Sequence, residues 1–491
     1  MLSVYDVRQM KEMDARLAAA SSLEATIARA GYGIATLAAR MLGGAYGKRV
    51  SVLAGKGNNG NDGREAARFL RSWGAKVEVY DYPEIDRKRL ADAQLVVDAV
   101  FGFGFRGDFP GIEVPAGVPL LAVDVPSGLD AGSGQACPAT RPADVTLALV
   151  GLKVGQLLGD APRLMGETYL YRLVGGVPEV GTSGRLVEPE DIRISAHAVD
   201  THKWSTGIAV LAGSPGMMGA AAFTCAAALA GGAGIAHLFA EDPSAAGLAM
   251  APLASGTVSV PAGFTGAGWE PEPQLSRYKA VVIGPGRGAT AGQELAVLSE
   301  HYAGPLVVDA DAITAIAAEP RLADLLARRQ GATVLTPHGA ELSRLAKALG
   351  SGTDHGSLAR LAVRLGVHLL VKGFPTRLYT RSGDFLAIPA NGPALASAGT
   401  GDVLSGLLAA RLAQGGDAEA AISEAVVIHG LAAQLEGTEP VTATRVLERI
   451  PEALGAMRSF PARRWSAPFH PVGARGPLYF EGQSRIEWSR R

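Results

Sequence analysis

The sequence contains few cysteines and almost no net charge. Among its 491 residues, the two cysteines are Cys137 and Cys225, which lie far apart in the chain. Their number and spacing exclude a disulfide framework and a zinc site made of cysteines, and they suit a reducing compartment. Lysine plus arginine (46) nearly balances aspartate plus glutamate (47). The net charge of -1 gives no general attraction to nucleic acid or to an anionic membrane.

Long apolar runs are also lacking. Charged residues such as Asp6, Lys11 and Asp14 interrupt the start of the chain, where a signal peptide would need a continuous apolar segment. The longest uncharged stretch with helical character, 217–240, is mostly alanine and glycine. We expect it to be a packed helix that leads into a strand, although its length could span a bilayer. We therefore expect a soluble, cytoplasmic protein that interacts with neither nucleic acid nor membrane.

What the sequence does contain is a repeated alternation of apolar strands and helices. Helices are expected at 1–20, where apolar residues recur at helical spacing, at 22–40, and over a long region from about 400 to 435. Strands are expected at 49–54, 77–80, 94–100, 120–125, 145–150, 208–212, 281–283, 306–309, 333–335 and 369–371. Strands this apolar, with helices between them, are typical of parallel sheets buried on both faces. The expected fold class is α/β, with two doubly wound parallel-sheet domains.

The domain boundary is expected where this alternation stops. Residues 174–200 carry glycine, proline and acidic residues without a period. The pattern predicts a first domain at 1–190 and a second domain at 195–460. The tail at 461–491 is rich in proline, glycine and arginine, and two interpretations stay open for it: disorder, or a segment that lies over a domain.

Polar loops follow three strands of the first half. The segment 55–63 (GKGNNGNDG) joins a strand to a helix, and N–H groups at a glycine-rich helix start can hold an anion. Asp98 ends a second strand and Asp124 ends a third. Ligands bind beyond the carboxyl ends of the strands in an open parallel sheet, so we expect the three loops to converge on one site. The alternative is a set of polar turns capped by asparagine and aspartate.

These loops carry a family resemblance. GNNGNDG, DAVFGFG and DVPSG resemble the motifs of the NAD(P)HX epimerase domain of bifunctional NAD(P)HX repair enzymes, over residues 1 to about 180. The resemblance implies a Rossmann-like domain in which Asp124 faces the reacting ring as a catalytic residue. It implies that the hydrated nicotinamide nucleotide contacts Asn58, Asn59, Gly60, Asn61, Asp62, Gly102, Phe103, Gly104, Phe105, Arg106, Gly107 and Asp108.

The same resemblance implies a potassium site and exposes one departure. Asn59, Asp98 and Ser127 are implied to coordinate K+, and Lys153 matches a Lys-Gly element of the family. Asn61 stands where the family usually has glycine. Asparagine tolerates left-handed backbone better than most residues, but we expect a tighter approach of the ligand there. The alternative left open is a first half that binds without catalysing.

In the second half, residues 398–402 (AGTGD) open an apolar helix. Backbone donors at such a helix start can stabilise a transferring phosphoryl group, and Asp402 can take a proton from the attacking hydroxyl. The alternative is a glycine-rich cap before a packed helix. Lys372 and Thr376 follow another strand and would place a cation and a hydroxyl near phosphates. His338 by itself is more typical of a capping or core histidine than of a ligand contact.

GTGD is shared across the ribokinase-like superfamily. Read in order, HK…LAGS, IGPG, VVDADA, TPH..E and KG..T resemble the ADP-dependent NAD(P)HX dehydratase of that superfamily, over about 195–450. The resemblance implies that ADP contacts Lys372, Gly373, Thr376, Ala398, Gly399, Thr400 and Gly401. It implies that the hydrated nucleotide contacts Gly286, Thr336, Pro337, His338, Glu341 and the catalytic Asp402. Arg287 stands where leucine is common, and we expect it to place a charge beside the substrate loop.

The sequence thus predicts a bifunctional nicotinamide-nucleotide repair enzyme. Its first domain would interconvert R and S epimers of NAD(P)HX, and its second would dehydrate the S epimer while ADP becomes AMP and phosphate. The expected cofactors are ADP, Mg2+ and K+, and a small-molecule substrate and a homo-oligomer are expected. The alternative is a small-molecule kinase of the ribokinase-like superfamily. Neither the choice between ADP and ATP nor that between NADHX and NADPHX follows from the sequence.

Overall fold

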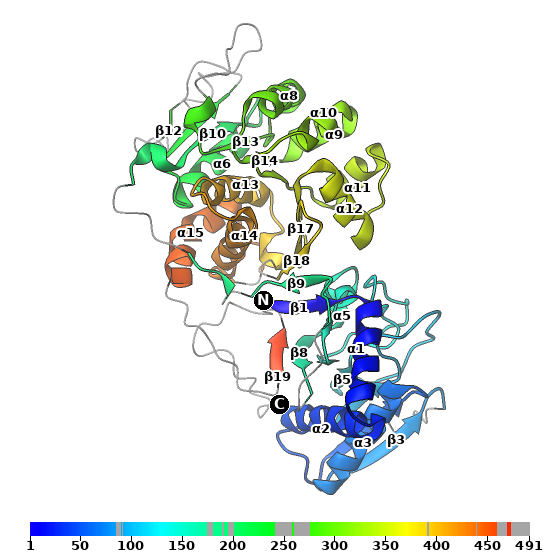
Figure 1. Cartoon of the computed structure of the whole chain (residues 1–491). Helices are drawn as coiled ribbons and strands as arrows, with labels where there is room; N and C mark the ends of the chain where they lie inside the picture. Colours follow the sequence, from blue (N-terminus) through cyan, green and yellow to red (C-terminus); the bar gives the residue numbers. More distant parts are fainter. Residues whose placement is uncertain are drawn as a thin grey trace. The chain divides into compact units, whose positions relative to one another are not determined.

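The computed structural model describes residues 1–84, 90, 92–173, 180–188, 191–194, 201–240, 258–259, 275–389, 392–437, 439–458 and 469–472. Two compact units divide the chain (Figure 1). The first comprises Met1–Leu186 with strand β19 (Phe469–Val472) from the tail, and the second comprises Val187–Ala462. Each is an α/β unit built on a doubly wound, mainly parallel sheet, so the expected fold class is confirmed.

The first unit contains a seven-stranded sheet in the order β19-β8-β6-β5-β4-β2-β3. Its strands are β2 (Arg49–Ala54), β3 (Lys76–Asp81), β4 (Leu95–Ala99), β5 (Leu120–Val123), β6 (Val145–Leu149) and β8 (Glu167–Tyr171), besides β19. All neighbours are parallel except β19, which pairs antiparallel with β8. The chain adds β3 on one side of β2 and β4 on the other. Loops after β2 and β4 therefore diverge and leave a crevice between them.

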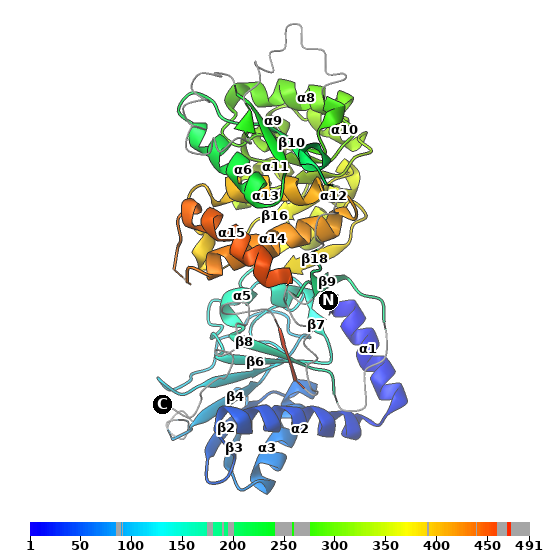
Figure 2. The same ribbon diagram turned by 90° about the vertical axis from the view of Figure 1, so that its left-hand side faces the viewer.

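The first unit also contains helices α1 (Val7–Ala20), α2 (Leu23–Met41), α3 (Asn58–Ser72) and the short α5 (Ala161–Leu164). Helices α2 and α3 pack side by side against the sheet (Figure 2). The predicted helix at 1–20 is wrong for its first residues. Leu2–Tyr5 form strand β1, and Asp6 then caps α1 by accepting a hydrogen bond from the Gln9 N–H. Strand β1 pairs with β7 (Leu152–Lys153) and with β9 (Gly184–Leu186), because its alternating side chains bury one face.

The tail contributes part of the first unit's sheet. Strand β19 aligns Phe469 with Tyr171 and Val472 with Thr168. For Phe469–Val472, this pairing favours the interpretation that the tail lies over a domain. The rest of 461–491 lies outside the described residues.

The second unit orders its strands β12-β11-β10-β13-β14-β15-β16-β17-β18. They are β10 (Gly207–Leu211), β11 (Ile235–Phe239), β12 (Val258–Ser259), β13 (Ala280–Ile283), β14 (Leu306–Val308), β15 (Thr333–Leu335), β16 (His368–Val371), β17 (Thr376–Tyr379) and β18 (Phe385–Ile388). The pairs from β12 to β16 are parallel, whereas β17 and β18 continue the sheet antiparallel. The direction of sheet growth reverses between β10 and β13, which places a second crevice there.

Two helical layers cover this sheet (Figure 1). One layer holds α8 (Ala291–His301), α9 (Ala310–Ala318), α10 (Arg321–Ala327), α11 (Gly339–Ala348) and α12 (His355–Leu365). The other holds α6 (Met218–Ala230), α13 (Thr400–Leu412), α14 (Ala418–Gln434) and α15 (Ala443–Arg458). The helical region expected at 400–435 is thus two helices, because Gly415 and Gly416 adopt positive φ and Asp417 caps a new helix.

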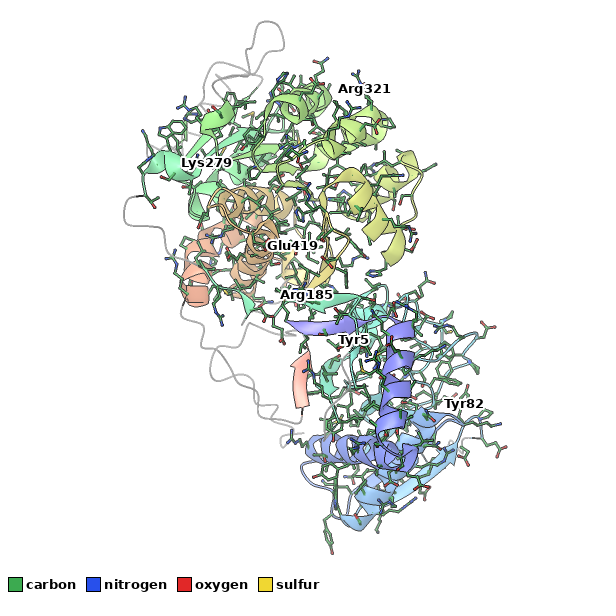
Figure 3. The ribbon with its side chains drawn as sticks, in the orientation of Figure 1. Tyr5, Tyr82, Arg185, Lys279, Arg321 and Glu419 are labelled. Carbon is green, nitrogen blue, oxygen red and sulfur yellow. The ribbon has the colours of Figure 1, made fainter. Side chains whose placement is uncertain are left out.

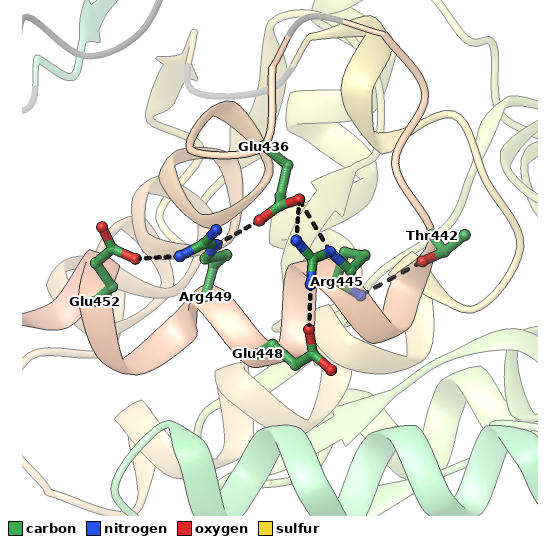
Figure 4. Close-up of polar contacts among 6 residues, drawn as sticks. All are labelled: Glu436, Thr442, Arg445, Glu448, Arg449 and Glu452. Carbon is green, nitrogen blue, oxygen red and sulfur yellow. Dashed lines mark hydrogen bonds and ion pairs between the residues drawn. The ribbon is translucent and has the colours of Figure 1, made fainter.

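Small residues let α13 approach α6 closely. A Cβ at Gly406 would lie 2.1 Å from the carbonyl oxygen of Thr224, so no larger residue fits there. On the outer side, Arg445 and Arg449 of α15 both bind Glu436, just past the end of α14, and each also binds a glutamate of its own helix (Figure 4). These contacts hold the layer that carries the start of α13. Within the described ranges, no helix has the length and hydropathy to cross a bilayer.

Two candidate active sites

A cavity of about 930 Å³ lies at the crevice of the first unit. Its wall includes residues of the loops after β2, β4 and β5 and of helices α1 and α2. Tyr82, which follows β3 and is labelled in Figure 3, also lines the cavity. Of the predicted substrate contacts, the cavity wall contains Asn58, Asn59, Asp62, Gly102, Phe103, Gly104, Phe105 and Arg106, and it contains Asp124. The other predicted contacts, Gly60, Asn61, Gly107 and Asp108, lie on the same loops outside that wall. The expected convergence of the three loops is therefore observed.

Position 61 needs no glycine. Asn61 lies in the first turn of α3 with ordinary helical backbone, and its side chain accepts a 3.4 Å hydrogen bond from Arg64. It does not line the cavity. Its side chain turns along the helix toward Arg64, and the tighter approach of a ligand at this position stays a prediction.

Asp124 is the best-anchored carboxylate of the cavity. It has a φ of 70°, which is strained for a residue with a side chain, and such strain concentrates at functional sites. Its Oδ2 accepts a 2.8 Å hydrogen bond from the Phe103 N–H, and its Oδ1 accepts one from the Leu149 N–H at 3.3 Å. The same Oδ1 pairs with Lys153 Nζ, and both partners are buried. Lys153 sits at the end of β7, so pairing of β7 with β1 helps to fix this ammonium group.

Two further carboxyl groups surround this pair. Burial, together with the charges of Asp124 and Asp14, raises the pKa of Asp62 well above its usual value. Burial and the charge of Asp124 raise the pKa of Asp14 to about 6, against the opposing charge of Lys153. Asp14 was not among the site residues predicted from the sequence. One signal existed: Asp14 lies four residues after Met10 and three before Leu17, on the apolar face of α1.

Asp98 and Ser127 lie together beneath the loops. Both oxygens of Asp98 accept hydrogen bonds from Ser127, one from its hydroxyl at 2.6 Å and one from its N–H at 2.9 Å. Burial raises the pKa of Asp98, although these hydrogen bonds oppose the rise. Among the residues that the structure describes, no lysine or arginine pairs with this carboxylate. A buried carboxylate beside a hydroxyl is a donor set that suits a hard monovalent cation.

The second unit builds its site around Asp309 at the end of β14. This buried carboxylate accepts hydrogen bonds from Lys372 Nζ at 2.8 Å and from the Ser405 hydroxyl at 2.7 Å. Burial opposes its ionisation, but the charge of Lys372 and the hydrogen bonds keep the pKa of Asp309 below its usual value. Burial likewise opposes the charge on Lys372, but Asp309, Glu341 and Asp402 raise its pKa. Both groups of the pair therefore stay charged.

Asp402 lies in the first turn of α13, beside this pair. Burial and the charge of Asp309 raise its pKa to about 6, and Lys372 opposes the rise. Gly399 precedes the helix with a φ of 90° and provides no side-chain cap. The Thr400 N–H lies 3.5 Å from the Ser397 carbonyl oxygen, and the N–H groups of Gly401 and Asp402 that follow it can face an anion. A Cβ built on Gly401 would lie 3.5 Å from Lys372 Nζ, which places the ammonium group at this helix start. Ala398 and Gly399 belong to the same turn.

Other predicted contacts hold the loops together. His338 and Glu341 form a capping box at the start of α11, as expected for a capping histidine. The buried Thr336 hydroxyl bonds to the Val308 carbonyl oxygen at 3.4 Å, and the Pro337 carbonyl accepts from the Lys372 N–H at 3.0 Å. The Thr376 hydroxyl donates to the carbonyl oxygen of Gly373. The Thr400 hydroxyl lies within hydrogen-bond distance of the carbonyl oxygens of Leu395 and Ser397. Gly286 adopts a φ of 57° and accepts from the Ser214 hydroxyl at 2.9 Å.

Arg287 places its charge next to Gly286, but this charge is paired and does not face the substrate loop freely. Its side chain is buried and pairs with Glu294 of α8, with Nε 2.7 Å from Oε2. It also donates to the carbonyl oxygen of Phe239 at 2.9 Å and to that of Gly213 at 3.4 Å. The guanidinium thus joins the ends of β10 and β11 to α8. Its charge is compensated inside the unit.

Two known family models match this chain, one in each of its two units. Residues 208–452 match the sequence model of a family described as NAD(P)H-hydrate dehydratase. Residues 24–94 and 81–155 match that of the YjeF-related protein N-terminus. Among solved structures, the ADP/ATP-dependent NAD(P)H-hydrate dehydratase from Bacillus subtilis, co-crystallized with ATP and Mg2+, is 25% identical with a TM-score of 0.45. The alignment covers 55% of this chain and 97% of that one.

Similarity to curated proteins extends over nearly the whole chain. The bifunctional NAD(P)H-hydrate repair enzyme of Mycobacterium leprae is 32% identical over 495 residues, covering 92% of this chain and 99% of that protein. The enzyme of the same name from Gloeobacter violaceus is 33% identical over 480 residues, covering 87% of this chain and 92% of that protein. The chain therefore belongs to the family of bifunctional NAD(P)H-hydrate repair enzymes.

Proposed function

We propose that this protein repairs hydrated nicotinamide nucleotides with both of its units. The first unit interconverts the R and S epimers of NAD(P)HX. The second dehydrates the S epimer to NAD(P)H, with conversion of ADP to AMP and phosphate. Membership of the family supports the reaction, and the two separate carboxylate–lysine sites support one reaction per unit.

The second unit's reaction depends on the start of α13. Hydroxide is a poor leaving group, and phosphorylation converts the hydroxyl into a good one. Asp402 accepts the proton of the substrate hydroxyl, for which its pKa of about 6 is suited at neutral pH. The N–H groups of Gly401 and its neighbours, with Lys372, stabilise the phosphoryl group as it transfers. ADP would supply that group, and Mg2+ bound with it would neutralise the charge of its phosphates. The position of Asp402 beside Lys372 carries this proposal.

The kinase alternative differs in the step after phosphoryl transfer. A small-molecule kinase would release a stable phosphorylated product, whereas the proposed reaction eliminates phosphate and restores the ring double bond. Family membership favours elimination. We propose ADP as the phosphoryl donor and ATP as the competing possibility, and assays with each nucleotide distinguish them.

A potassium ion fits the first unit. Asn59, Asp98 and Ser127 would hold it, since they offer an amide oxygen, a buried carboxylate and a hydroxyl, and K+ would supply the positive charge that this carboxylate lacks. Ser127 also accepts a 2.9 Å hydrogen bond from the Phe101 N–H, so the potassium site would hold the loop after β4 in place.

We propose a cytoplasmic location. The cysteines Cys137 and Cys225 are free thiols, which suits this reducing compartment.

Separate epimers test this function. With pure S epimer, Mg2+ and ADP, we expect recovery of the absorbance of the reduced ring, with AMP and phosphate formed in equal amounts. With pure R epimer, we expect the same recovery at a rate above the spontaneous epimerisation. No recovery from the S epimer with either ADP or ATP would refute the dehydratase. Recovery from the R epimer only at the spontaneous rate would leave the first unit as a binding module.

A further inference from the structure

Epimerisation of the hydrated ring requires a group that both accepts and donates a proton. The hydroxyl-bearing carbon is bonded to the ring nitrogen. When the hydroxyl loses its proton and the nitrogen gains one, the O–H and C–N bonds break while C=O and N–H bonds form. Closure on the opposite face of the carbonyl reverses these changes and gives the other epimer. No proton is consumed overall, so one residue can serve both steps.

Asp124 is poorly placed to be that residue alone. Its carboxylate accepts hydrogen bonds from Phe103 and Leu149 and pairs with the buried Lys153. Accepting a proton would leave the Lys153 ammonium buried without its counter-charge, which is energetically costly. Asp124 therefore serves best as a fixed negative charge in the cavity.

Asp14 lines the same cavity as Asp124. It projects from α1, whereas the other carboxylates of the cavity, Asp62 and Asp124, belong to α3 and to the loop after β5. In the part of the chain that the structure describes, Asp14 has no hydrogen-bond or ion-pair partner. The charged and titratable groups around it are Asp62, Asp124 and Lys153, and Lys56, Arg106 and Tyr82 also line the cavity. A carboxyl group without such a partner at the wall of a cavity is available to a ligand.

We propose that Asp14 is the catalytic residue that exchanges a proton with the substrate during epimerisation, a role that rests on the proposed function of the first unit. Asp62 is less suited, because burial and the charges of Asp124 and Asp14 raise its pKa well above the usual value and so disfavour the ionised form that accepts a proton. Asp14 populates both protonation states there, since its pKa is about 6. Burial and the neighbouring charge of Asp124 set that value, with Lys153 opposing.

The full chain carrying Asp14→Asn tests the assignment. Asparagine keeps the shape of the side chain but exchanges no proton. Starting from the R epimer with ADP and Mg2+, we expect repair to slow about 100-fold or more, to the spontaneous rate as its floor. Starting from the S epimer, we expect a rate within about twofold of wild type, which shows that the chain is folded. Asp14→Glu should restore part of the lost rate, and Glu12→Gln, on the exposed side of α1, is the matched control.

A pH profile separates proton transfer from a structural role. The rate from the R epimer is measured under conditions in which epimerisation, and not dehydration, limits repair. For wild type, this rate should fall on acidification through about pH 6. The residual rate of Asp14→Asn should not show this fall. Equal rates for wild type and Asp14→Asn would overturn the assignment. A slowed variant whose rate still falls on acidification through about pH 6 would also overturn it. A wild-type chain that does not accelerate epimerisation would refute the proposed function of the first unit instead.

Discussion

The first unit encloses its aspartate–lysine pair more completely than the second. Lys153 and Asp124 have exposed side-chain fractions of 0% and 5%, whereas Lys372 keeps 21% beside Asp309 at 2%. Both pairs stand at the carboxyl ends of parallel strands, although the two sheets differ in strand order. A more exposed lysine remains accessible to a polyanion such as a nucleotide phosphate. A fully enclosed lysine can only set the charge of its partner.

A second carboxyl group accompanies each pair. Asp14 beside Asp124 and Asp402 beside Asp309 both have a pKa raised to about 6. The causes occur in the same order: burial first, then the charge of the paired aspartate, with the lysine opposing. In both units, burial beside an aspartate–lysine pair brings the pKa of a neighbouring carboxyl group close to neutral pH, where proton transfer is efficient.

Removing the second carboxyl group of one unit should separate the two activities most strongly. For Asp402→Asn, we expect dehydration of the S epimer to fall about 10²- to 10⁴-fold, because the proton acceptor is lost. Interconversion of the epimers, followed by chiral chromatography, should not change. The exposed aspartate of α10 provides a control, Asp324→Asn. A dehydration rate for Asp402→Asn close to that of the control would contradict the parallel between the units.

Removing each lysine should show the difference in burial as a difference in lost stability. Lys153→Met leaves the Asp124 carboxylate buried without its cation, and we expect a loss of about 3–5 kcal/mol in the stability of the first unit. Lys372→Met should cost less, since Ser405 still donates to Asp309 and the site is more open. Hydrogen exchange in increasing urea, read separately for peptides of each unit, measures both.

The double variant Lys153→Met with Asp124→Asn should recover part of the first loss, because it removes the orphaned charge. Equal losses for the two single lysine variants would show that depth of burial does not distinguish the pairs.

Acidification should have the smallest effect. Asp402 acts as a proton acceptor only when ionised, and its pKa is raised to about 6. The dehydration rate under saturating substrate should therefore be flat above that pH and fall about tenfold per pH unit below it. Lys372 stays protonated throughout, since its neighbours raise its pKa. A rate that is independent of pH down to pH 5 would exclude Asp402 as the acceptor.

Much of the fold could be read from local patterns. Apolar strands alternate with helices along the chain, and this alternation determined the α/β class because a strand buried on both faces needs apolar residues throughout. Strand β1 escaped prediction because four residues before a helix cap carry too little pattern. Strands β17 and β18, which run antiparallel, were not predicted, although the Ser-Gly-Asp sequence between them is typical of a hairpin turn. The break between α13 and α14 could have been found, since Gly415 and Gly416 precede a capping aspartate.

Sequence by itself determined the family, the two sets of loops and the candidate carboxylates Asp124 and Asp402, because these depend on residue types at short, fixed spacings. The tertiary structure alone decided that Asp14 faces Asp124 and that Arg287 is neutralised by Glu294. It alone decided that Lys372 reaches Asp309 across 63 residues of chain. Burial and charge coupling depend on distances in space, and no local pattern in a chain encodes which distant segments will meet.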